Sequence, residues 1–314
     1  MQNRYHCLVV DLMHESLLPM LSQASIEADY RPDIKRGEFE QIADKYEIMV
    51  VRSKFFFDEE LLSYCKRLKI LCRAGAGVDN IDVNAAEKKN IIILNAPEGN
   101  RDAVAEHTVG MILTLFNKLH KADAEVRKKI WDREGNRGYE LKSKTVAIIG
   151  YGYMGSAVAE RLSGFGCRVI GYDKYKTQYS NSFITECNMQ QIFAEADIVS
   201  LHVPLTEETR FMINKNWINS FEKNIWLINT SRGEILLLRD LVESLKQGKI
   251  KGVALDVLEN EKLNTMTQQQ SEAFEYLKNC DNVLFSPHVA GWTHESYVRI
   301  NEVLIDKLKK TLSH

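Results

Sequence analysis

The stretch Val146-Ala-Ile-Ile-Gly150-Tyr-Gly152-Tyr-Met-Gly155 decides how this chain folds. An apolar, β-branched run ends in glycines with G-x-G-x-x-G spacing, and a helix-like segment, residues 156–165, follows directly. In such a turn Gly150 permits the tight bend, Gly152 lets a phosphate approach the backbone, and Gly155 lets the helix pack closely on the strand. The free N–H groups at the start of the helix then face the phosphates, so the pattern predicts a dinucleotide-binding unit.

A carboxylate stands at the end of the next predicted strand. Asp173 follows Gly155 by 18 residues, which is near the spacing of a carboxylate that binds the adenosine ribose hydroxyls. Because a carboxylate there repels the 2′-phosphate of NADP, NAD is the predicted cofactor. Lys174 and Lys176 follow closely and would soften this preference, so NADP stays open as the alternative.

Short β-branched runs alternate with longer amphipathic segments along the chain, which is typical of βα units and parallel sheets. Six strands are predicted from the glycine turn onward, the number in a complete dinucleotide-binding sheet: 145–150, 168–173, 198–203, 224–231, 252–257 and 283–288. Four more are predicted in the first third of the chain: 6–11, 47–52, 69–73 and 91–95.

A connection rich in Pro and Gly, residues 95–100, separates the two sets of strands. Helices are predicted over 101–130 and 293–312, and 259–271 is predicted as a surface loop. The sequence thus predicts an α/β protein with two doubly wound parallel-sheet domains. These are a flavodoxin-like substrate domain, residues 1–98 plus 293–314, and a Rossmann NAD-binding domain, residues 99–292.

The composition excludes several classes of protein. Lys and Arg number 41 and Asp and Glu 43, so there is no basic excess to bind nucleic acid. No stretch approaches the roughly 18 apolar residues of a membrane span, and Asp11 and Glu15 interrupt the N-terminal apolar run too early for a signal peptide. The six cysteines lack a C-x-x-C pair and indicate reduced thiols. We therefore expect a cytoplasmic protein whose partners are a small molecule and a second copy of itself.

Three polar residues follow strands of the second domain. Hydride transfer to a 2-oxo acid needs a cation that holds the carboxylate, and an oriented acid that protonates the alkoxide. Arg232, Glu261 and His288 follow predicted strands and so lie at the carboxyl edge of the sheet, where such folds bind ligands. A lone arginine or histidine is more often structural. His202 is interpreted as structural or close to the cofactor, His107 as lining the site or packing a helix, and no metal site is expected.

The order and spacing of these motifs resemble the D-isomer-specific 2-hydroxyacid dehydrogenase family over nearly the whole chain, and most closely its phosphoglycerate dehydrogenase branch. The motifs are Arg73-Ala-Gly75-Ala-Gly77-Val-Asp79-Asn80-Ile-Asp82, Asn95-Ala-Pro97-Glu-Gly99-Asn100 with Ala105-Glu106, the glycine turn, Asn229-Thr-Ser-Arg232-Gly233, Ala254-Leu-Asp256-Val257 with Glu261, and Ser286-Pro-His288. The resemblance implies that Arg232 grips the substrate carboxylate and carbonyl, that His288 is the general acid/base, and that Glu261 hydrogen-bonds His288 and fixes its ring.

The resemblance also implies ligand contacts. Backbone N–H groups around Ala76 and Gly77 hold the substrate carboxylate, and Arg52 binds a phosphate or second anion, with a surface role for Arg52 left open. The implied cofactor contacts, besides Gly150, Gly152, Gly155 and Asp173, are Tyr153 and Met154 over the pyrophosphate, Val203 and Thr230 along the cofactor cleft, Asp256 at the nicotinamide carboxamide and Gly291 beside the nicotinamide.

The implied reaction is hydride transfer between NAD(H) and a small 2-hydroxy or 2-oxo acid, most closely 3-phosphoglycerate and phosphohydroxypyruvate in serine biosynthesis. A hydroxypyruvate or glyoxylate reductase, or a reductase of another 2-oxo acid, is the main alternative, and an NAD-sensing corepressor-like binding protein is a remote one. The predicted helix 101–130 resembles the family's dimer contact, so we expect a homodimer.

The sequence departs from the family pattern at two positions. Leu237 stands where an acidic residue is common at a helix start, which predicts a lost helix cap, and Lys262 replaces a proline after Glu261. The chain also ends soon after the segment 293–312, so no C-terminal regulatory domain is expected.

Overall fold

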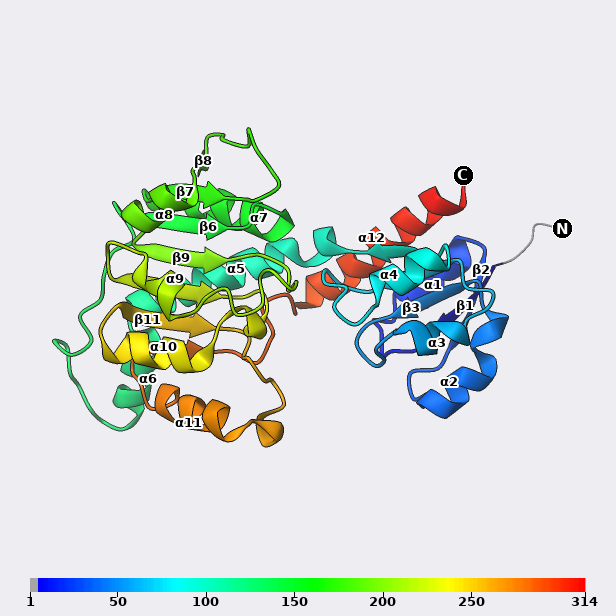
Figure 1. The fold of residues 1–314 in the computed structure, drawn as a ribbon, viewed down its shortest axis with the longest axis horizontal. Helices are drawn as coiled ribbons and strands as arrows, with labels where there is room; N and C mark the ends of the chain where they lie inside the picture. Colours follow the sequence, from blue (N-terminus) through cyan, green and yellow to red (C-terminus); the bar gives the residue numbers. More distant parts are fainter. Residues whose placement is uncertain (1–4, 314) are drawn as a thin grey trace. The chain divides into compact units, whose positions relative to one another are not determined.

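The computed structural model describes residues 5–313, which form two compact α/β units (Figure 1). Unit 1 comprises the described residues up to Asp102 together with those from Trp292 onward, and unit 2 is Ala103–Gly291. These bounds lie within a few residues of the predicted domain limits. Each unit has its own parallel sheet, which confirms the predicted fold of two doubly wound domains.

Unit 1 contains a five-stranded sheet in the order β2-β1-β3-β4-β5, with every pair parallel. This is the flavodoxin-like order. Its strands are β1 (Tyr5–Val9), β2 (Ile26–Tyr30), β3 (Ile48–Val51), β4 (Ile70–Arg73) and β5 (Ile92–Asn95). The sequence did not predict β2, because it is an edge strand in which Ile26 alone is buried and charged residues break the apolar pattern.

Helices cover both faces of this sheet. They are α1 (Leu17–Gln23), α2 (Arg36–Ile42), η1 (Ala43–Lys45), α3 (Glu59–Ser63), α4 (Val83–Lys88) and α12 (His294–Leu312). On one face α12 packs beside α1 and buries Ile300, Leu304 and Leu308, which recur at helical spacing. Helices α2, α3 and α4 cover the other face. The C-terminal helix is therefore part of the core of unit 1.

Unit 2 contains a seven-stranded parallel sheet in the order β12-β11-β10-β9-β6-β7-β8. Its strands are β6 (Thr145–Ile149), β7 (Arg168–Tyr172), β8 (Thr185–Glu186), β9 (Ile198–Leu201), β10 (Ile225–Asn229), β11 (Ile250–Leu255) and β12 (Val283–Phe285). The six predicted strands are present, and β8 is an additional edge strand of two residues. The strand order reverses between β6 and β9, which places the glycine turn after β6 at the crossover where such sheets bind dinucleotides.

The helices of unit 2 are α5 (Pro97–Phe116, which starts in unit 1), α6 (Leu119–Arg127), α7 (Tyr153–Leu162), η2 (Ser163–Phe165), α8 (Met189–Glu195), α9 (Lys215–Asn219), η3 (Gly233–Ile235), α10 (Leu238–Lys246), η4 (Leu263–Thr265) and α11 (Gln268–Leu277).

Two of the predicted elements in this unit were wrong. The predicted helix 101–130 is two helices, because Lys118 adopts a left-handed conformation with φ 51°. The glutamines of the predicted loop 259–271 begin α11, with Thr267 as N-cap and Gln270 completing a capping box.

Helices α5 and α7 cover one face of this sheet, and α8 to α11 cover the other.

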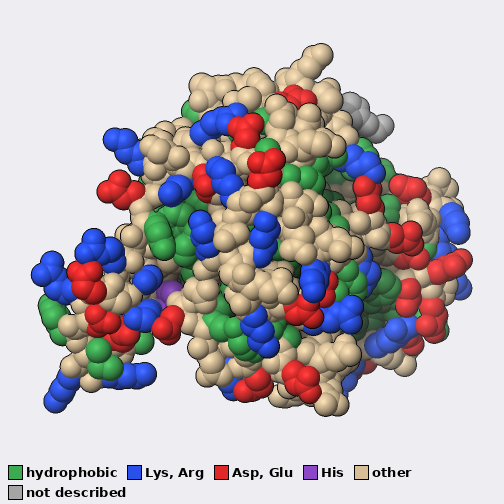
Figure 2. Space-filling model, turned by 60° about the vertical axis from the view of Figure 1, so that its left-hand side comes forward, with side chains coloured by type: hydrophobic (Ala, Val, Ile, Leu, Met, Phe, Trp, Pro, Cys, Tyr) green, Lys and Arg blue, Asp and Glu red, His purple; other side chains and the backbone are tan. Residues whose placement is uncertain are grey.

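Within residues 5–313, no helix combines the length and apolarity that crossing a membrane requires. Lys and Arg side chains are interspersed with Asp and Glu over the surface seen in Figure 2. All six cysteines are free, and burial raises the pKa of Cys65 and Cys72 to about 12.

Candidate active site

The glycine turn joins β6 to α7, as predicted, and its geometry requires glycine. Gly150 has φ 95°, and a Cβ at Gly155 would lie 2.0 Å from the Gly150 carbonyl oxygen. A Cβ at Gly152 would meet nothing within 4 Å, so the space beside this N-cap residue is open. Tyr153 and Met154 form the first turn of α7. The open backbone at the start of a helix fits the pyrophosphate of a dinucleotide.

Asp173 follows β7 and ties its own turn to the glycine turn. Its carboxylate accepts the backbone N–H of Tyr151 at 2.8 Å and those of Tyr175 and Lys176 at 2.9 Å each. Burial alone would raise the pKa of the Asp173 carboxyl, but these hydrogen bonds outweigh burial and lower it. The two lysines that would weaken NAD selectivity differ in their contacts: Lys174 pairs with a glutamate, whereas Lys176 binds the glycine turn and helps to lower the pKa of Asp173. Lys174 Nζ lies 2.5 Å from Glu208 Oε1, and Lys176 Nζ donates to the Tyr151 carbonyl.

Two predicted catalytic residues and one predicted cofactor contact follow the ends of three neighbouring strands. Strands β10, β11 and β12 are adjacent and parallel, and Arg232, Asp256 and His288 follow their carboxyl ends. Buried Asn229 shapes the turn before Arg232: its Nδ2 donates to the Arg232 carbonyl at 2.9 Å, and its Oδ1 accepts from Ser231. The Arg232 guanidinium donates to the Ser231 carbonyl at 2.7 Å. All of these residues lie at the same edge of the sheet.

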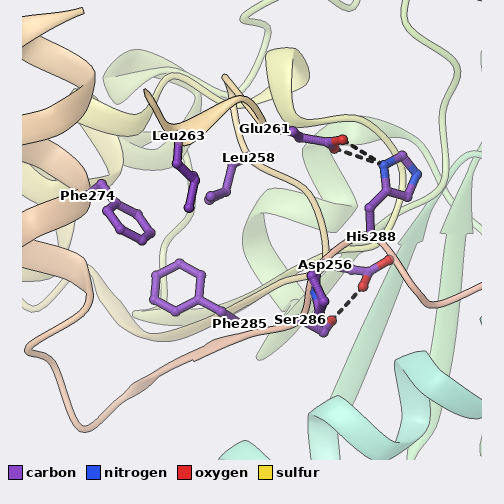
Figure 3. Close-up of a pocket in the computed structure, with 9 residues that line it drawn as sticks. Asp256, Leu258, Glu261, Leu263, Phe274, Phe285, Ser286 and His288 are labelled. Carbon is purple, nitrogen blue, oxygen red and sulfur yellow. Dashed lines mark hydrogen bonds and ion pairs between the residues drawn. The ribbon is translucent and has the colours of Figure 1, made fainter. Parts of the chain in front are cut away.

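Glu261 and His288 form a direct pair at this edge (Figure 3). His288 Nδ1 lies 2.9 Å from Glu261 Oε1 and 3.0 Å from Oε2. Because an ionised carboxylate only accepts hydrogen bonds, Nδ1 carries the proton and Nε2 is left to act on a ligand. His288 has φ 55°, in the left-handed region that few non-glycine residues occupy. Such a conformation persists only where neighbouring contacts enforce it.

Asp256 supplies those contacts. Its carboxylate accepts from Ser286 Oγ at 2.5 Å and from the backbone N–H of Val289 and Ala290 at 2.9 Å each. Its carbonyl accepts the His288 N–H at 2.7 Å. The buried carboxylate therefore fixes the turn on both sides of His288, a role that the sequence did not predict. Oδ2 accepts one of these hydrogen bonds and retains a lone pair for the predicted nicotinamide carboxamide.

His107 on α5 extends this network. Its Nε2 lies 3.0 Å from Ser286 Oγ and 3.7 Å from Asp256 Oδ1. The structure thus connects His107 to the support of His288, which favours the site-lining interpretation over helix packing alone. In the sequence Ser286 is one residue of a motif, and nothing there indicates that its hydroxyl joins two elements so far apart in the chain.

Glu259 replaces the helix cap that Leu237 lacks. The N–H of Leu238, at the start of α10, donates to Glu259 Oε2 at 3.0 Å, while Gln270 Nε2 donates to Glu259 Oε1 at 2.8 Å. The predicted loss of a side-chain cap at Leu237 is present, but Glu259 compensates for it. This carboxylate also joins the segment after Arg232 to the loop that carries Glu261.

A pocket of about 390 Å³ opens beside the Glu261–His288 pair (Figure 3). Its apolar wall consists of Leu258, Leu263, Phe274 and Phe285, and the rings of Phe274 and Phe285 lie 5.6 Å apart. This wall comes from the loop after β11, from α11 and from β12. The pair itself stays accessible, because the side chains of His288 and Glu261 are 48% and 47% exposed.

The remaining predicted residues of unit 2 lie near the glycine turn or the catalytic edge. A Cβ at Gly150 would contact Val203 Cγ1, and Thr230 Oγ1 lies 3.1 Å from Thr108 Oγ1. His202 Nε2 lies 2.8 Å from Ser200 Oγ, and desolvation lowers the pKa of His202 to about 4. A neutral His202 suits a structural role better than proton transfer near pH 7. Among residues 5–313, no cluster of three or more His, Cys, Asp or Glu side chains suits a metal.

Unit 1 contains the predicted substrate contacts. Val51 pairs with Arg73, so Arg52 after β3 and the segment Ala74–Gly77 after β4 lie at one carboxyl edge. Asn95 Nδ2 holds the Ala76 carbonyl at 2.6 Å. In the described part of the chain, the N–H groups of Ala76 and Gly77 donate to no protein acceptor. They are therefore available to a carboxylate.

The comparisons with known proteins agree with this architecture. A family model described as the NAD binding domain of D-isomer specific 2-hydroxyacid dehydrogenase matches residues 109–290. The chain belongs to the D-isomer-specific 2-hydroxyacid dehydrogenase family. Members of this family are NAD-dependent oxidoreductases that act on the CH–OH group of 2-hydroxy acids, and the predicted family and cofactor are confirmed.

Relatives in this family have several substrates in their names. The chain is 34% identical over 308 residues to the D-3-phosphoglycerate dehydrogenase of Methanocaldococcus jannaschii, a match that covers 97% of this chain and 57% of the relative. It is 33% identical over 279 residues to the hydroxypyruvate reductase of Thermotoga maritima, covering 89% of each. The structure of D-lactate dehydrogenase from Aquifex aeolicus, complexed with NAD and lactic acid, superposes with a TM-score of 0.84 at 29% identity over 98% of this chain and 95% of that chain. The chain spans just over half the length of the D-3-phosphoglycerate dehydrogenases that it matches first.

The pKa of His202 generates a prediction about stability. The unfolded chain protonates this histidine near pH 6.5 and the folded chain only near pH 4, so stability is lost as the pH falls through this window. The variant His202→Gln should lose this component, and its melting temperature should fall less steeply between pH 7 and 4.5 than that of the wild type. Calorimetry over this range checks it, with the exposed His6→Gln as control. Parallel curves for wild type and His202→Gln would contradict the assignment.

Asp173 generates a prediction about cofactor choice. If Asp173 binds the ribose as predicted, Asp173→Asn removes a negative charge from that site, so the ratio of kcat/KM with NAD to that with NADP should fall by about tenfold. Lys174→Gln is the matched control: because Lys174 is paired with Glu208, this change should leave the ratio within about twofold. An unchanged ratio in Asp173→Asn would remove Asp173 from the ribose site.

Proposed function

We propose that this protein is an NAD-dependent D-2-hydroxyacid dehydrogenase that transfers a hydride between nicotinamide and C2 of a small 2-hydroxy or 2-oxo acid. The observation that carries this proposal is the Glu261–His288 pair, which Asp256 supports at the carboxyl edge of a dinucleotide-binding sheet. NAD supplies or accepts the hydride when it is bound. Gly150, Gly152, Gly155 and Asp173 would hold its pyrophosphate and ribose, and Asp256 and Gly291 would lie at its nicotinamide.

His288 is the general acid and base in this proposal. Its protonated form donates from Nε2 to the oxygen on C2 during reduction, and its neutral form accepts that proton during oxidation. Glu261 accepts from Nδ1, so it selects the tautomer and stabilises the imidazolium. The left-handed turn fixes the ring in advance, so little reorganisation is needed when substrate binds.

Arg232 binds the substrate in this proposal. Its guanidinium binds the carboxylate and polarises the ketone, because its planar N–H donors match a carboxylate in bidentate geometry. This contact orients C2 for hydride transfer. Within unit 1, the N–H groups of Ala76 and Gly77 are proposed donors to an anionic group of the substrate.

We propose 3-phosphoglycerate and phosphohydroxypyruvate as the substrate pair, which would place the enzyme in serine biosynthesis. Arg52 is the contact for the phosphate, since it is a half-buried cation at the same edge as Ala76 and Gly77. The two first-matched relatives, both named D-3-phosphoglycerate dehydrogenase, support this choice. Hydroxypyruvate reduction is the second candidate, because the hydroxypyruvate reductase of Thermotoga maritima matches over 89% of both chains.

We also propose that the protein is a cytoplasmic homodimer. Helix α6 and the segment after it expose several large apolar side chains, which a second copy would cover. Trp131 is 80% exposed, and the others are Leu119, Val126, Ile130 and Tyr139.

Removing the acid tests the mechanism. In His288→Gln, kcat should fall by about 10²- to 10⁴-fold, because no other side chain replaces the proton donor. NADH affinity, measured by fluorescence titration, should stay within about twofold, because His288 acts on substrate rather than on the nucleotide. Turnover at the wild-type rate would exclude His288 as the acid.

A substrate panel tests the specificity. In assays of NADH oxidation, kcat/KM should be higher for phosphohydroxypyruvate than for hydroxypyruvate, glyoxylate or pyruvate. Arg52→Ala should raise the KM for phosphohydroxypyruvate by about tenfold or more, because charge-assisted hydrogen bonds to the phosphate are lost. The KM for hydroxypyruvate should change little. A wild-type preference for hydroxypyruvate or glyoxylate would support the second candidate instead.

A further inference from the structure

Arg52 lies against an aromatic surface within unit 1. Its guanidinium carbon is 3.6 Å from the centre of the Trp292 ring and 5.6 Å from that of Tyr297. The two rings lie 4.8 Å apart with a 41° angle between their planes. Trp292 itself is 45% exposed and immediately precedes Thr293, the N-cap of α12. A guanidinium this close to an indole face is attracted by the ring electrons and held parallel to them.

One dipeptide after β1 anchors both sides of this stack. The buried carboxylate of Asp11 accepts the backbone N–H of Arg52 at 2.7 Å, and also those of Ser53 and Lys54. The carbonyl of the adjacent Leu12 accepts the Tyr297 hydroxyl at 3.0 Å. The backbone of Arg52 and the Tyr297 ring, which packs on the Trp292 ring, are therefore fixed to the same dipeptide.

The Arg52 guanidinium is partly shielded from water, but no carboxylate forms an ion pair with it in the described residues. Among residues 5–313, no Asp or Glu oxygen lies within ion-pairing distance of its guanidinium, and Asp11 is already engaged by three backbone donors. Burial lowers the pKa of Arg52, and Tyr297 and Asp11 offset this only in part. Partly burying a cation without a counter-ion costs desolvation free energy. An anionic ligand that pairs with the cation would offset this cost.

We propose that Trp292 is a positioning residue for substrate specificity: its indole holds the Arg52 guanidinium ready for the second anionic group of a 2-oxo acid. This inference rests on the proposed function and extends it to a residue of the α12 N-terminus. The indole covers one face of the guanidinium and leaves the N–H donors at its edge uncovered. Tyr297 interacts with the guanidinium through its hydroxyl, and the other donors of the five-donor guanidinium can meet two oxygens of a phosphate or carboxylate. A flat aromatic ring does this, whereas a branched aliphatic side chain would fill the space without orienting the cation.

The test is steady-state kinetics of the full chain with NADH, using phosphohydroxypyruvate and hydroxypyruvate as the two probes. Trp292→Leu should raise the KM for phosphohydroxypyruvate by about three- to thirtyfold. The KM for hydroxypyruvate and both kcat values should stay within about twofold. Trp292→Phe retains an aromatic face and should recover much of the wild-type KM. A KM that rises equally for both acids would mean that Trp292 has only a structural role, and would overturn the proposal.

A double-mutant cycle shows whether Trp292 acts through Arg52. In the Arg52→Ala background, Trp292→Leu should cause no further rise in the KM for phosphohydroxypyruvate, whereas additive effects would contradict the coupling. Phe56→Leu is the matched control, because Phe56 is an exposed aromatic residue that follows Arg52 by four positions and contacts no cation among the described residues. It should leave all the constants unchanged.

Failure of the proposed substrate is distinguishable from failure of this inference. If the enzyme reduces other 2-oxo acids but not phosphohydroxypyruvate, oxaloacetate becomes the probe, because its second anion is a carboxylate. A selective rise in its KM in Trp292→Leu would support the role of Trp292, and an unselective rise would overturn it. If the protein reduces no 2-oxo acid, the proposed function fails. Equilibrium binding of 3-phosphoglycerate in the presence of NAD then decides: equal weakening by Arg52→Ala and Trp292→Leu supports the role, and unchanged binding overturns it.

Discussion

The edge of unit 2 where the proposed catalytic residues lie depends on one buried group, the carboxylate of Asp256, a residue that is 1% exposed. A carboxylate at this depth is tolerated only when its oxygens are hydrogen-bonded, and its partners come from the turn that carries His288. The requirement to satisfy Asp256 therefore fixes a backbone conformation that His288 would not otherwise adopt. Ser286 passes the same constraint on to His107 of α5. One carboxylate thus connects the end of β11, the turn that carries His288 and helix α5.

Local backbone geometry explains which features the sequence could predict. The glycine turn was predicted because its requirements are largely local: Gly150 has φ 95°, and a Cβ at Gly155 would lie 2.0 Å from the carbonyl oxygen of Gly150, five residues earlier. The central strands were predicted because they are buried on both faces and their apolar runs are unbroken. The positions of Arg232, Glu261 and His288 relative to the sheet follow from these strands, since each residue comes shortly after one. Their roles came from the resemblance of the motifs to a family rather than from periodicity.

Features that depend on distant residues escaped prediction. Strands β2 and β8 lie at sheet edges, so their side chains lack the burial that produces a pattern. The end of α5 is set by the left-handed Lys118, a residue type that carries no such signal. Glu259 caps a helix that starts 21 residues before it, and Trp292 stacks on an arginine far away in the chain. Each of these contacts joins residues that only the completed fold brings together, so the spacing of residues along the sequence does not predict them.

The position of α12 in the core of unit 1 also determines the order in which the chain can fold during synthesis. Unit 2 is one continuous segment and can become compact as soon as it leaves the ribosome. The strands of unit 1 are made before unit 2, yet one face of their sheet lacks Ile300, Leu304 and Leu308 until α12 emerges. Unit 1 is therefore begun before unit 2 and completed after it. While unit 2 is being synthesised, one face of the apolar strands of unit 1 stays exposed. Exposed apolar strands are prone to aggregate, so a chaperone would protect the chain most during this interval.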